Sequence, residues 1–172
     1  MSIKILGVDP GSRTTGFGIV ELNKGKVLYI NSGYIKLDHL EMNERLQEIF
    51  AGISTVAKTY QPTFAAIEQI FMHQNPGAAL KLGQARGAAI VAMTSHGIPV
   101  AEYSARQIKQ AVVGYGAAKK QQIQVMVCRL LNIQELPQAD AADALAIALC
   151  HAHSQTSLTK LGVTGTREGR WR

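Results

Sequence analysis

The feature that most constrains the fold is a single acid at the end of an apolar run. Residues 5–20 read ILGVDPGSRTTGFGIV, so Asp9 closes one apolar stretch and a Pro-Gly turn leads to the next. Apolar runs on both sides of a turn predict two strands. A carboxylate at the end of a buried strand is costly unless a positive or hydrogen-bonding group compensates it. Asp9 therefore needs a partner that this segment does not supply.

The order of the periodic segments predicts an α/β fold with a mixed five-stranded sheet flanked by helices. Three apolar runs in succession indicate an antiparallel start, and helical spacing then alternates with short apolar runs. This order argues against a plain Rossmann sheet. The predicted elements are strands over 3–9, 14–22 and 26–37, a helix over 46–57, a strand over 63–68, a helix over 76–96, a strand over 98–103, and helices over 105–113, after Gly116 and over 138–155.

The helix expected over 76–96 is apolar around more than one side. Asn75 is its predicted N-cap, and Gly97 follows its end. Gly83 and Gly87, one turn apart, would let another backbone approach closely. We expect these glycines to pack on the sheet of the same chain, and a contact with a second subunit is the alternative.

Length and composition indicate one folded domain. The 172 residues are 47% hydrophobic and 17% charged, which is typical of a globular chain with a sizeable core. We expect the domain to span residues 1–155 and a flexible basic tail to follow over 156–172. No apolar stretch reaches the length of a membrane span and no leader precedes the first strand, so we predict a cytoplasmic protein. Cys128 and Cys150 lack metal or redox spacing and are expected to be reduced core thiols.

The positive charge lies entirely in the later part of the chain. Residues 1–68 hold seven Lys and Arg and seven Asp and Glu, whereas residues 69–172 hold eleven and five. The net charge of +6 and a pI near 9.5 therefore come from one side of the sequence. Such an imbalance favours a polyanionic partner, with nucleic acid as the leading candidate, although charge alone is weak evidence because it also serves solubility.

Three further acids complement Asp9. Glu68 ends another short apolar run, at a strand end where open α/β sheets bind their ligands. Asp140 and Asp143 are three residues apart near the start of a predicted helix, so they share one face among small alanines. Ordinary enrichment of acids in a first helical turn explains this pair equally well when it is taken alone. With Asp9 and Glu68, however, the pair puts four acids where three elements can converge.

Four converging carboxylates predict a metal site. Left uncompensated, they would repel one another and raise each other's pKa. No Arg or Lys lies near them in these motifs, which leaves divalent cations as the compensating charge. Hard oxygen ligands suit Mg²⁺ or Mn²⁺. Two such ions, about 3.5–4 Å apart, would hold the attacking water and the departing oxygen of a phosphoryl displacement.

Four blocks carry a specific resemblance to a known family: GVDPGSRTTGFG, AIEQIFMHQNPGAALKLGQARG, EYSARQIKQAVVGYGAAKKQQIQ and QADAADALAIA. In this order they closely resemble the RuvC family of Holliday-junction resolvases, over about residues 3–153. The resemblance implies a ribonuclease-H-like fold, a homodimer, and Mg²⁺-dependent symmetrical nicking of four-way DNA junctions that leaves 5′-phosphate and 3′-hydroxyl ends. The catalytic and metal-binding acids of the family fall on Asp9, Glu68, Asp140 and Asp143.

The same resemblance implies residues that contact DNA. Phe71 matches an aromatic suited to stacking on an unpaired base near the junction centre. Lys109 and Lys120 match basic residues expected to hold backbone phosphate, although the adjacent Lys119 leaves the second assignment ambiguous. A RuvA and RuvB branch-migration complex is the implied partner, and a short thymine-containing core is the implied preferred sequence.

Three other functions are alternatives to a junction resolvase. The first block alone also fits an actin-like sugar kinase or an Hsp70-type ATPase, but such proteins need about twice this length and a second phosphate loop. A junction-binding protein without catalysis would be expected to lack at least one of the four acids. The residues alone leave open a related nuclease or transposase with another substrate. His151 and His153 are expected at a fraying helix end, solvated and without metal.

Overall fold

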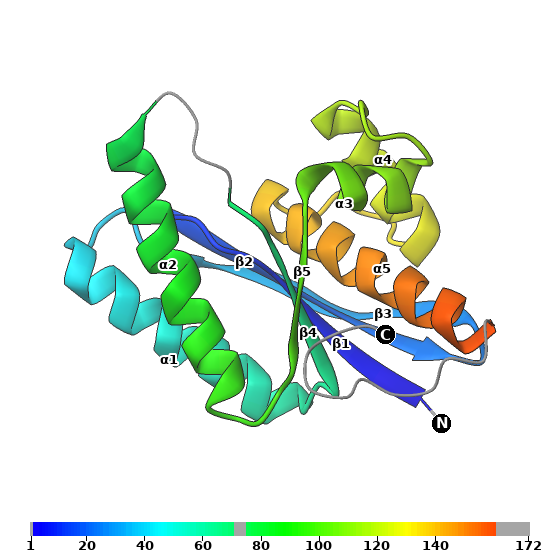
Figure 1. Cartoon of the computed structure of the whole chain (residues 1–172), viewed down its shortest axis with the longest axis horizontal. Coiled ribbons are helices and arrows are strands. Elements are labelled where there is room, and N and C mark those ends of the chain that lie inside the picture. The colour runs from blue at the N-terminus through cyan, green and yellow to red at the C-terminus, as the bar shows by residue number, and fades with distance from the viewer. Residues whose placement is uncertain (1, 71–74, 161–172) are drawn as a thin grey trace.

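The computed structural model describes residues 2–70 and 75–160, which form a five-stranded sheet with helices on both faces (Figure 1). Across the sheet the strand order is β3-β2-β1-β4-β5; the pairs β3–β2 and β2–β1 are antiparallel, and the pairs β1–β4 and β4–β5 are parallel. The expected mixed sheet is therefore confirmed. The strands are β1 (Ser2–Asp9), β2 (Thr14–Asn23), β3 (Lys26–Lys36), β4 (Phe64–Glu68) and β5 (Val100–Tyr103).

The register of the parallel strands decides where the acids lie. Val8 of β1 pairs with Ile67 of β4, so Asp9 and Glu68 follow at the same edge of the sheet. The carboxyl ends of parallel strands are where α/β sheets place their ligands. This register confirms that two acids from distant parts of the sequence share one edge.

The helices divide the core into two layers. Helices α1 and α2 cover one face of the sheet, and α3, α4 and α5 cover the other (Figure 1). Because the sheet is covered on both faces, its central strands are apolar on both sides. The helices are α1 (Met42–Tyr60), α2 (Pro76–Thr94), α3 (Ala105–Val113), α4 (Lys120–Leu131) and α5 (Ala139–Lys160).

Two glycines let α5 lie directly against the sheet. A Cβ atom at Gly7 of β1 would stand 2.0 Å from the carbonyl oxygen of Ala144, and one at Gly16 of β2 would stand 2.0 Å from that of Asp140. Real Cβ atoms do not come so close to backbone, so neither position accepts a side chain without moving the helix. These contacts fix how near the first turns of α5 lie to the end of β1.

The expectation that the glycines of α2 pack on the sheet is wrong. The buried side chains of α2 include Ala85, Ala89 and Met93, which pack in the layer shared with α1. Cβ positions at Gly83 and Gly87 have no atom within 4 Å among the described residues, so both glycines face outward. The predicted N-cap is confirmed, because the Asn75 side chain accepts a hydrogen bond from the amide of Ala78, and the helix ends two residues earlier than expected.

Helix α5 is longer than its sequence pattern indicated. It continues to Lys160, five residues past the expected end at 155, and residues 161–172 of the predicted tail lie outside the described residues. The hydroxyl of Thr156 donates to the main-chain carbonyl of Ala152 at 2.9 Å, and the hydroxyl of Ser157 donates to the main-chain carbonyl of His153 at 3.0 Å. Polar side chains that bond back to the helix in this way do not end it.

The prediction that His151 is solvated at a fraying end is wrong. His151 is buried, and its Nδ1 lies 2.9 Å from the Tyr103 hydroxyl. Burial lowers the pKa of His151 to about 4, so the ring is neutral in the core. The ring of His153, two residues further along α5, bonds instead to the carbonyl of Ala111 at 3.0 Å. Both histidines therefore anchor α5 to neighbouring elements.

The two cysteines are free, as expected, and burial raises the pKa of Cys150 to about 12.

Within residues 2–70 and 75–160, no helix combines the length and apolar character needed to span a membrane.

Candidate active site

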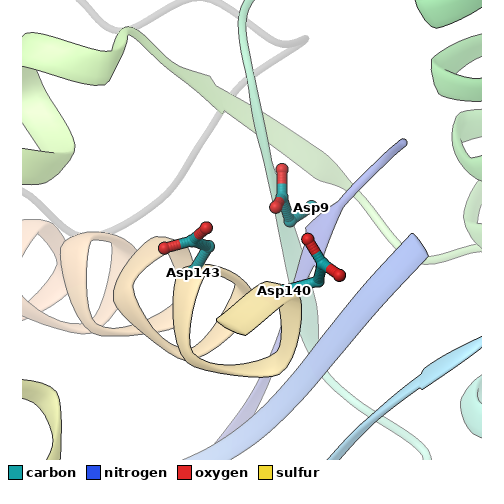
Figure 2. Close-up of side chains that lie close together, drawn as sticks. All are labelled: Asp9, Asp140 and Asp143. Atoms are coloured by element: carbon teal, nitrogen blue, oxygen red, sulfur yellow. The ribbon is translucent and has the colours of Figure 1, made fainter. Parts of the chain in front are cut away.

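Three carboxylates from two elements converge at one edge of the sheet. Asp9 extends from the end of β1, and Asp140 and Asp143 extend from the first turns of α5 (Figure 2). One carboxylate oxygen from each residue lies within 4.8 Å of the other two. Segments more than 130 residues apart in the chain therefore supply a single group of oxygens.

The charge of this group shows in the pKa of Asp9, which is raised to about 7. Burial is the largest cause, and the carboxylates of Asp143, Glu68 and Asp140 add to it in that order. The ammonium of Lys120 opposes the shift. Asp9 is therefore an acid whose charged form lacks sufficient compensation within the protein.

Glu68 belongs to the same site but stands slightly apart. It does not join the group of three within 4.8 Å, although burial and the charge of Asp143 raise its pKa. Lys109 and Lys120 act in the opposite direction on the Glu68 carboxyl. Among the described residues the structure thus brings together the four predicted acids, three closely and the fourth beside them.

Two open cavities meet at Glu68. One, of about 230 Å³, is lined by Asp9, Pro10 and Glu68 among others. The other, of about 290 Å³, is lined by Glu68, Lys109, Lys120 and Asp143. Acids and two lysines therefore line the same open recess, an arrangement suited to a ligand that carries both a metal ion and phosphate oxygens.

The inference that only divalent cations are left to compensate the acids is wrong, because the fold brings a lysine from another motif to them. Lys120, at the start of α4, places its Nζ 2.6 Å from a carboxylate oxygen of Asp143. The hydrogen bond from Lys120 to Asp143 raises the lysine pKa, so the ammonium is charged. The sequence motif could not reveal this contact, because the packing of α4 against α5 creates it. Lys120, with Lys109 acting on Glu68, compensates only part of the charge of the four acids.

The structure also separates the two candidate lysines. Lys120 faces Asp143, whereas Lys119 is the residue before α4, where its backbone amide donates to the Gln122 side chain at 2.8 Å. Lys109 lines the same recess from α3. Phe71, the predicted stacking residue, lies outside the described residues.

Gln138 is a site residue that the sequence reasoning missed. Its side-chain oxygen accepts from the amides of Asp140 and Ala141, which caps the start of α5. Its side-chain nitrogen donates to a carboxylate oxygen of Asp140 at 2.7 Å. The sequence pattern placed Gln138 inside the helix predicted over 138–155, whereas α5 begins at Ala139, so Gln138 caps the helix and also orients an acid of the site.

The donor set fits a hard divalent cation. Three carboxylate oxygens within 4.8 Å of one another, with a fourth acid beside them, are the ligands that Mg²⁺ or Mn²⁺ accepts. The raised pKa of Asp9 is what such a cluster shows before a cation reduces the repulsion. The chemistry of the residues therefore agrees with the predicted metal site.

Comparisons with known proteins give one consistent family. The profile of the family described as crossover junction endodeoxyribonuclease RuvC matches residues 5–151. The chain is 58% identical to a protein of that name from Acinetobacter baumannii, over 96% of this chain and 91% of the relative. It is 54% identical to one from Tolumonas auensis, over 98% of both chains.

A solved structure agrees in fold. Thermus thermophilus RuvC in complex with a Holliday junction substrate superposes with a TM-score of 0.83 and 33% identity, over 94% of this chain and 97% of the other. The ribonuclease-H-like fold expected from the sequence is therefore confirmed by likeness as well as by the strand order.

Proposed function

Because the chain belongs to the RuvC family of crossover junction endodeoxyribonucleases, we propose that it resolves four-way DNA junctions by paired, symmetrical nicks. The observation that carries this proposal is the convergence of Asp9, Asp140 and Asp143, with Glu68 beside them, in a recess that two lysines also line. A DNA-binding protein without catalysis has no need for a cluster of mutually repelling acids, because acids weaken contact with phosphate.

Each acid has a proposed role. Asp9, Glu68, Asp140 and Asp143 would hold two Mg²⁺ ions, for which Mn²⁺ substitutes. Bound there, the metal would activate water and reduce the charge that develops on the scissile phosphate, leaving 5′-phosphate and 3′-hydroxyl ends. Gln138 keeps Asp140 in place through its side-chain amide.

The basic side of the recess is proposed to hold the DNA. Lys109 and Lys120 line the recess together with Glu68 and Asp143, where an ammonium could contact a phosphate oxygen next to the reacting one. Phe71 is proposed to stack on an unpaired base, as the resemblance implies. The excess of positive charge after residue 68 supports a polyanionic substrate. Affinity should accordingly fall steeply as salt rises.

A homodimer is the proposed assembly, since two symmetrical nicks need two sites. The outward side of α2 supports a contact there: Leu80 is 71% exposed and Val91 is 56% exposed on one side of the helix. Gly83 and Gly87 lie between them with open space above, so another backbone could approach closely. A RuvA–RuvB branch-migration complex is the proposed partner, and a cytoplasmic location stays a prediction.

The proposal is tested by cleavage assays on three substrates of matched length. A synthetic four-way junction, a linear duplex and an RNA–DNA hybrid are incubated with the protein and Mg²⁺, and the products are resolved on denaturing gels. We expect paired nicks at symmetrical positions of the junction and little cleavage of the other two. Equal cleavage of the hybrid would indicate a different ribonuclease-H-like nuclease.

Sedimentation at working concentration checks the assembly. A dimer, with or without junction DNA, is expected. A monomer in both conditions would contradict symmetrical cutting by one complex, and Leu80→Asp provides a variant in which loss of the dimer should be accompanied by loss of paired nicks.

A further inference from the structure

Arg86 of α2 lies on the opposite face of the sheet from the lysines and makes two contacts at the end of β4. Its Nε donates to the main-chain carbonyl of Glu68 at 3.2 Å, and its Nη2 lies 2.7 Å from a carboxylate oxygen of Glu102 in β5. The Arg86 side chain is only 20% exposed. A guanidinium presents several donors in one rigid plane, so two acceptors on neighbouring strands can hold it in a single orientation.

The carbonyl that Arg86 contacts lies where the sheet stops. The amides of Ala65 and Gln69 bond to the β5 side, to Pro99 and Tyr103, so the backbone groups of Glu68 face β1. On the β1 side, the next main-chain donor of the β1–β4 hydrogen-bond ladder would be residue 10. This residue is Pro10, which has no N–H to donate to the Glu68 carbonyl. Buried backbone carbonyls are nearly always paired, and here a side chain from a helix supplies the donor.

We infer that Arg86 is a positioning residue for the proposed cleavage: its guanidinium, held by Glu102, fixes the main chain of Glu68 and with it the direction of that carboxylate. This inference rests on the proposed function of Glu68 as a catalytic acid. Glu68 is the acid that most needs such support, because it stands at a strand end outside the closest group of three oxygens.

The alternative is an ion pair that only joins α2 to β5. The two roles differ in what they change. An ion pair of that kind affects the free energy of unfolding and leaves the folded protein fully active. A positioning residue lowers the rate of cleavage at saturating substrate, leaves junction affinity unchanged, and weakens divalent cation binding at the acids. Residues that orient ligands in this way typically contribute about 10- to 100-fold to metal affinity or activity.

The experiment compares Arg86→Gln with Lys81→Gln, which removes an exposed positive charge from the same helix. Three quantities are measured for each: the single-turnover rate on a saturating four-way junction, the Kd for that junction in Ca²⁺, and the Kd for Mn²⁺ by calorimetry without DNA. For Arg86→Gln we expect the rate to fall about 10- to 100-fold and Mn²⁺ to bind more weakly, with junction affinity within about twofold. Lys81→Gln should match the wild type in rate and in Mn²⁺ affinity.

Two further variants test the route through Glu102. Arg86→Lys keeps the charge without the planar pair of donors and should recover only part of the rate. Glu102→Gln should lower the rate less than Arg86→Gln does, and should have no further effect when Arg86 is already glutamine, because both act through one contact. Independent, multiplicative effects of the two changes would overturn the inference.

Other outcomes are equally decisive. Equal rates and equal Mn²⁺ affinities for folded Arg86→Gln and Lys81→Gln would overturn the inference while leaving the proposed function intact. A weakened junction Kd with an unchanged saturated rate would make Arg86 a DNA contact instead, which also overturns it. Should the wild type fail to cut the junction, the proposed function fails, and the Mn²⁺ titrations still decide whether Arg86 supports the acids.

Discussion

Asp9, which is partly buried, and His151, which is buried, are titratable side chains next to the same sheet, and their surroundings differ in kind. His151 has the Tyr103 hydroxyl at 2.9 Å, the Gln155 amide at 3.2 Å, and the Phe64 ring with its centroid 5.4 Å away. Asp9 has three other acids near it and one lysine. Burial shifts the pKa of both groups toward the neutral form, to about 4 for His151 and about 7 for Asp9.

These two environments distinguish a structural polar group from a functional one. The neutral form of His151 is satisfied by what surrounds it, so nothing further is needed to stabilise it. The acids near Asp9 increase the penalty of burying its charge, and only the ammonium of Lys120 among the described residues opposes them, so the charged form of Asp9 needs additional positive charge, which a bound cation would supply. Buried polarity alone does not identify a site; uncompensated buried charge is the stronger indication.

The largest expected effect is on catalysis. Asp9→Asn or Asp143→Asn removes a proposed metal ligand and should lower the rate of junction cleavage by a factor on the order of 10³ or more, with junction binding nearly unchanged. His151→Phe should cut at close to the wild-type rate. Single-turnover cleavage with a parallel gel-shift titration makes the comparison. Either asparagine variant cutting at the wild-type rate would refute the metal assignment.

Next in size is the pH dependence of the metal-free protein. The folded pKa of Asp9, about 7, exceeds its ordinary value of 3.8, so the folded state is favoured when the group is protonated. The free energy of unfolding should therefore fall as pH rises from about 4 to about 7, by about 4 kcal/mol from this group. Urea unfolding in EDTA measures it, with Asp9→Asn as the reference. Parallel curves for the two proteins would contradict the assignment, and adding Mn²⁺ should restore the lost stability.

His151 should give the opposite slope in a similar pH range. Its folded pKa, about 4, is below the ordinary 6.5, so its contribution is complete above pH 6.5 and is lost as pH falls through 4. The loss should be about 3 kcal/mol relative to His151→Phe, whose side chain does not titrate. The same urea series measures it. An acid transition unchanged by the phenylalanine would show that another group controls it.

The smallest effect compares adjacent lysines. Lys120→Met removes the ammonium that is paired with Asp143 and should slow cleavage about 10- to 100-fold, because charge near the reacting phosphate is no longer offset. Lys119→Met should slow it less than about threefold, since that residue is the helix cap beside the site. Cleavage rates at a fixed, low salt concentration decide between them. Equal losses would mean that both lysines contact DNA.

Much of the fold could be predicted from the sequence because the signals are local. The apolar runs before Asp9 and Glu68 and the Asn75 cap all depend on neighbouring residues, and the structure has each of them. Three predicted acids also converge as expected, since strand ends and helix starts follow from the same local patterns.

The contacts that the sequence did not reveal are made between elements. Lys120 meets Asp143 only because α4 packs on α5, and Arg86 meets Glu68 across the end of the sheet. His151 was expected to be exposed because polar residues follow it in the sequence. In the structure it is buried and forms a hydrogen bond with the Tyr103 hydroxyl of β5. Periodicity indicates which face of a helix is apolar, but it does not identify the side chain on another element that a polar residue will contact.

The spacing of the acids depends on Gly7 and Gly16, the two glycines that lie under α5 and carry none of the chemistry themselves. With methyl groups at Gly7 or Gly16 the helix would have to rise from the sheet, carrying Asp140 and Asp143 away from Asp9 together. A protein altered in this way would keep every acid and every motif block while its oxygens stood too far apart to share one ion. Surveys that judge a nuclease intact by its carboxylates alone would count it as active, so these two positions belong in any such inspection.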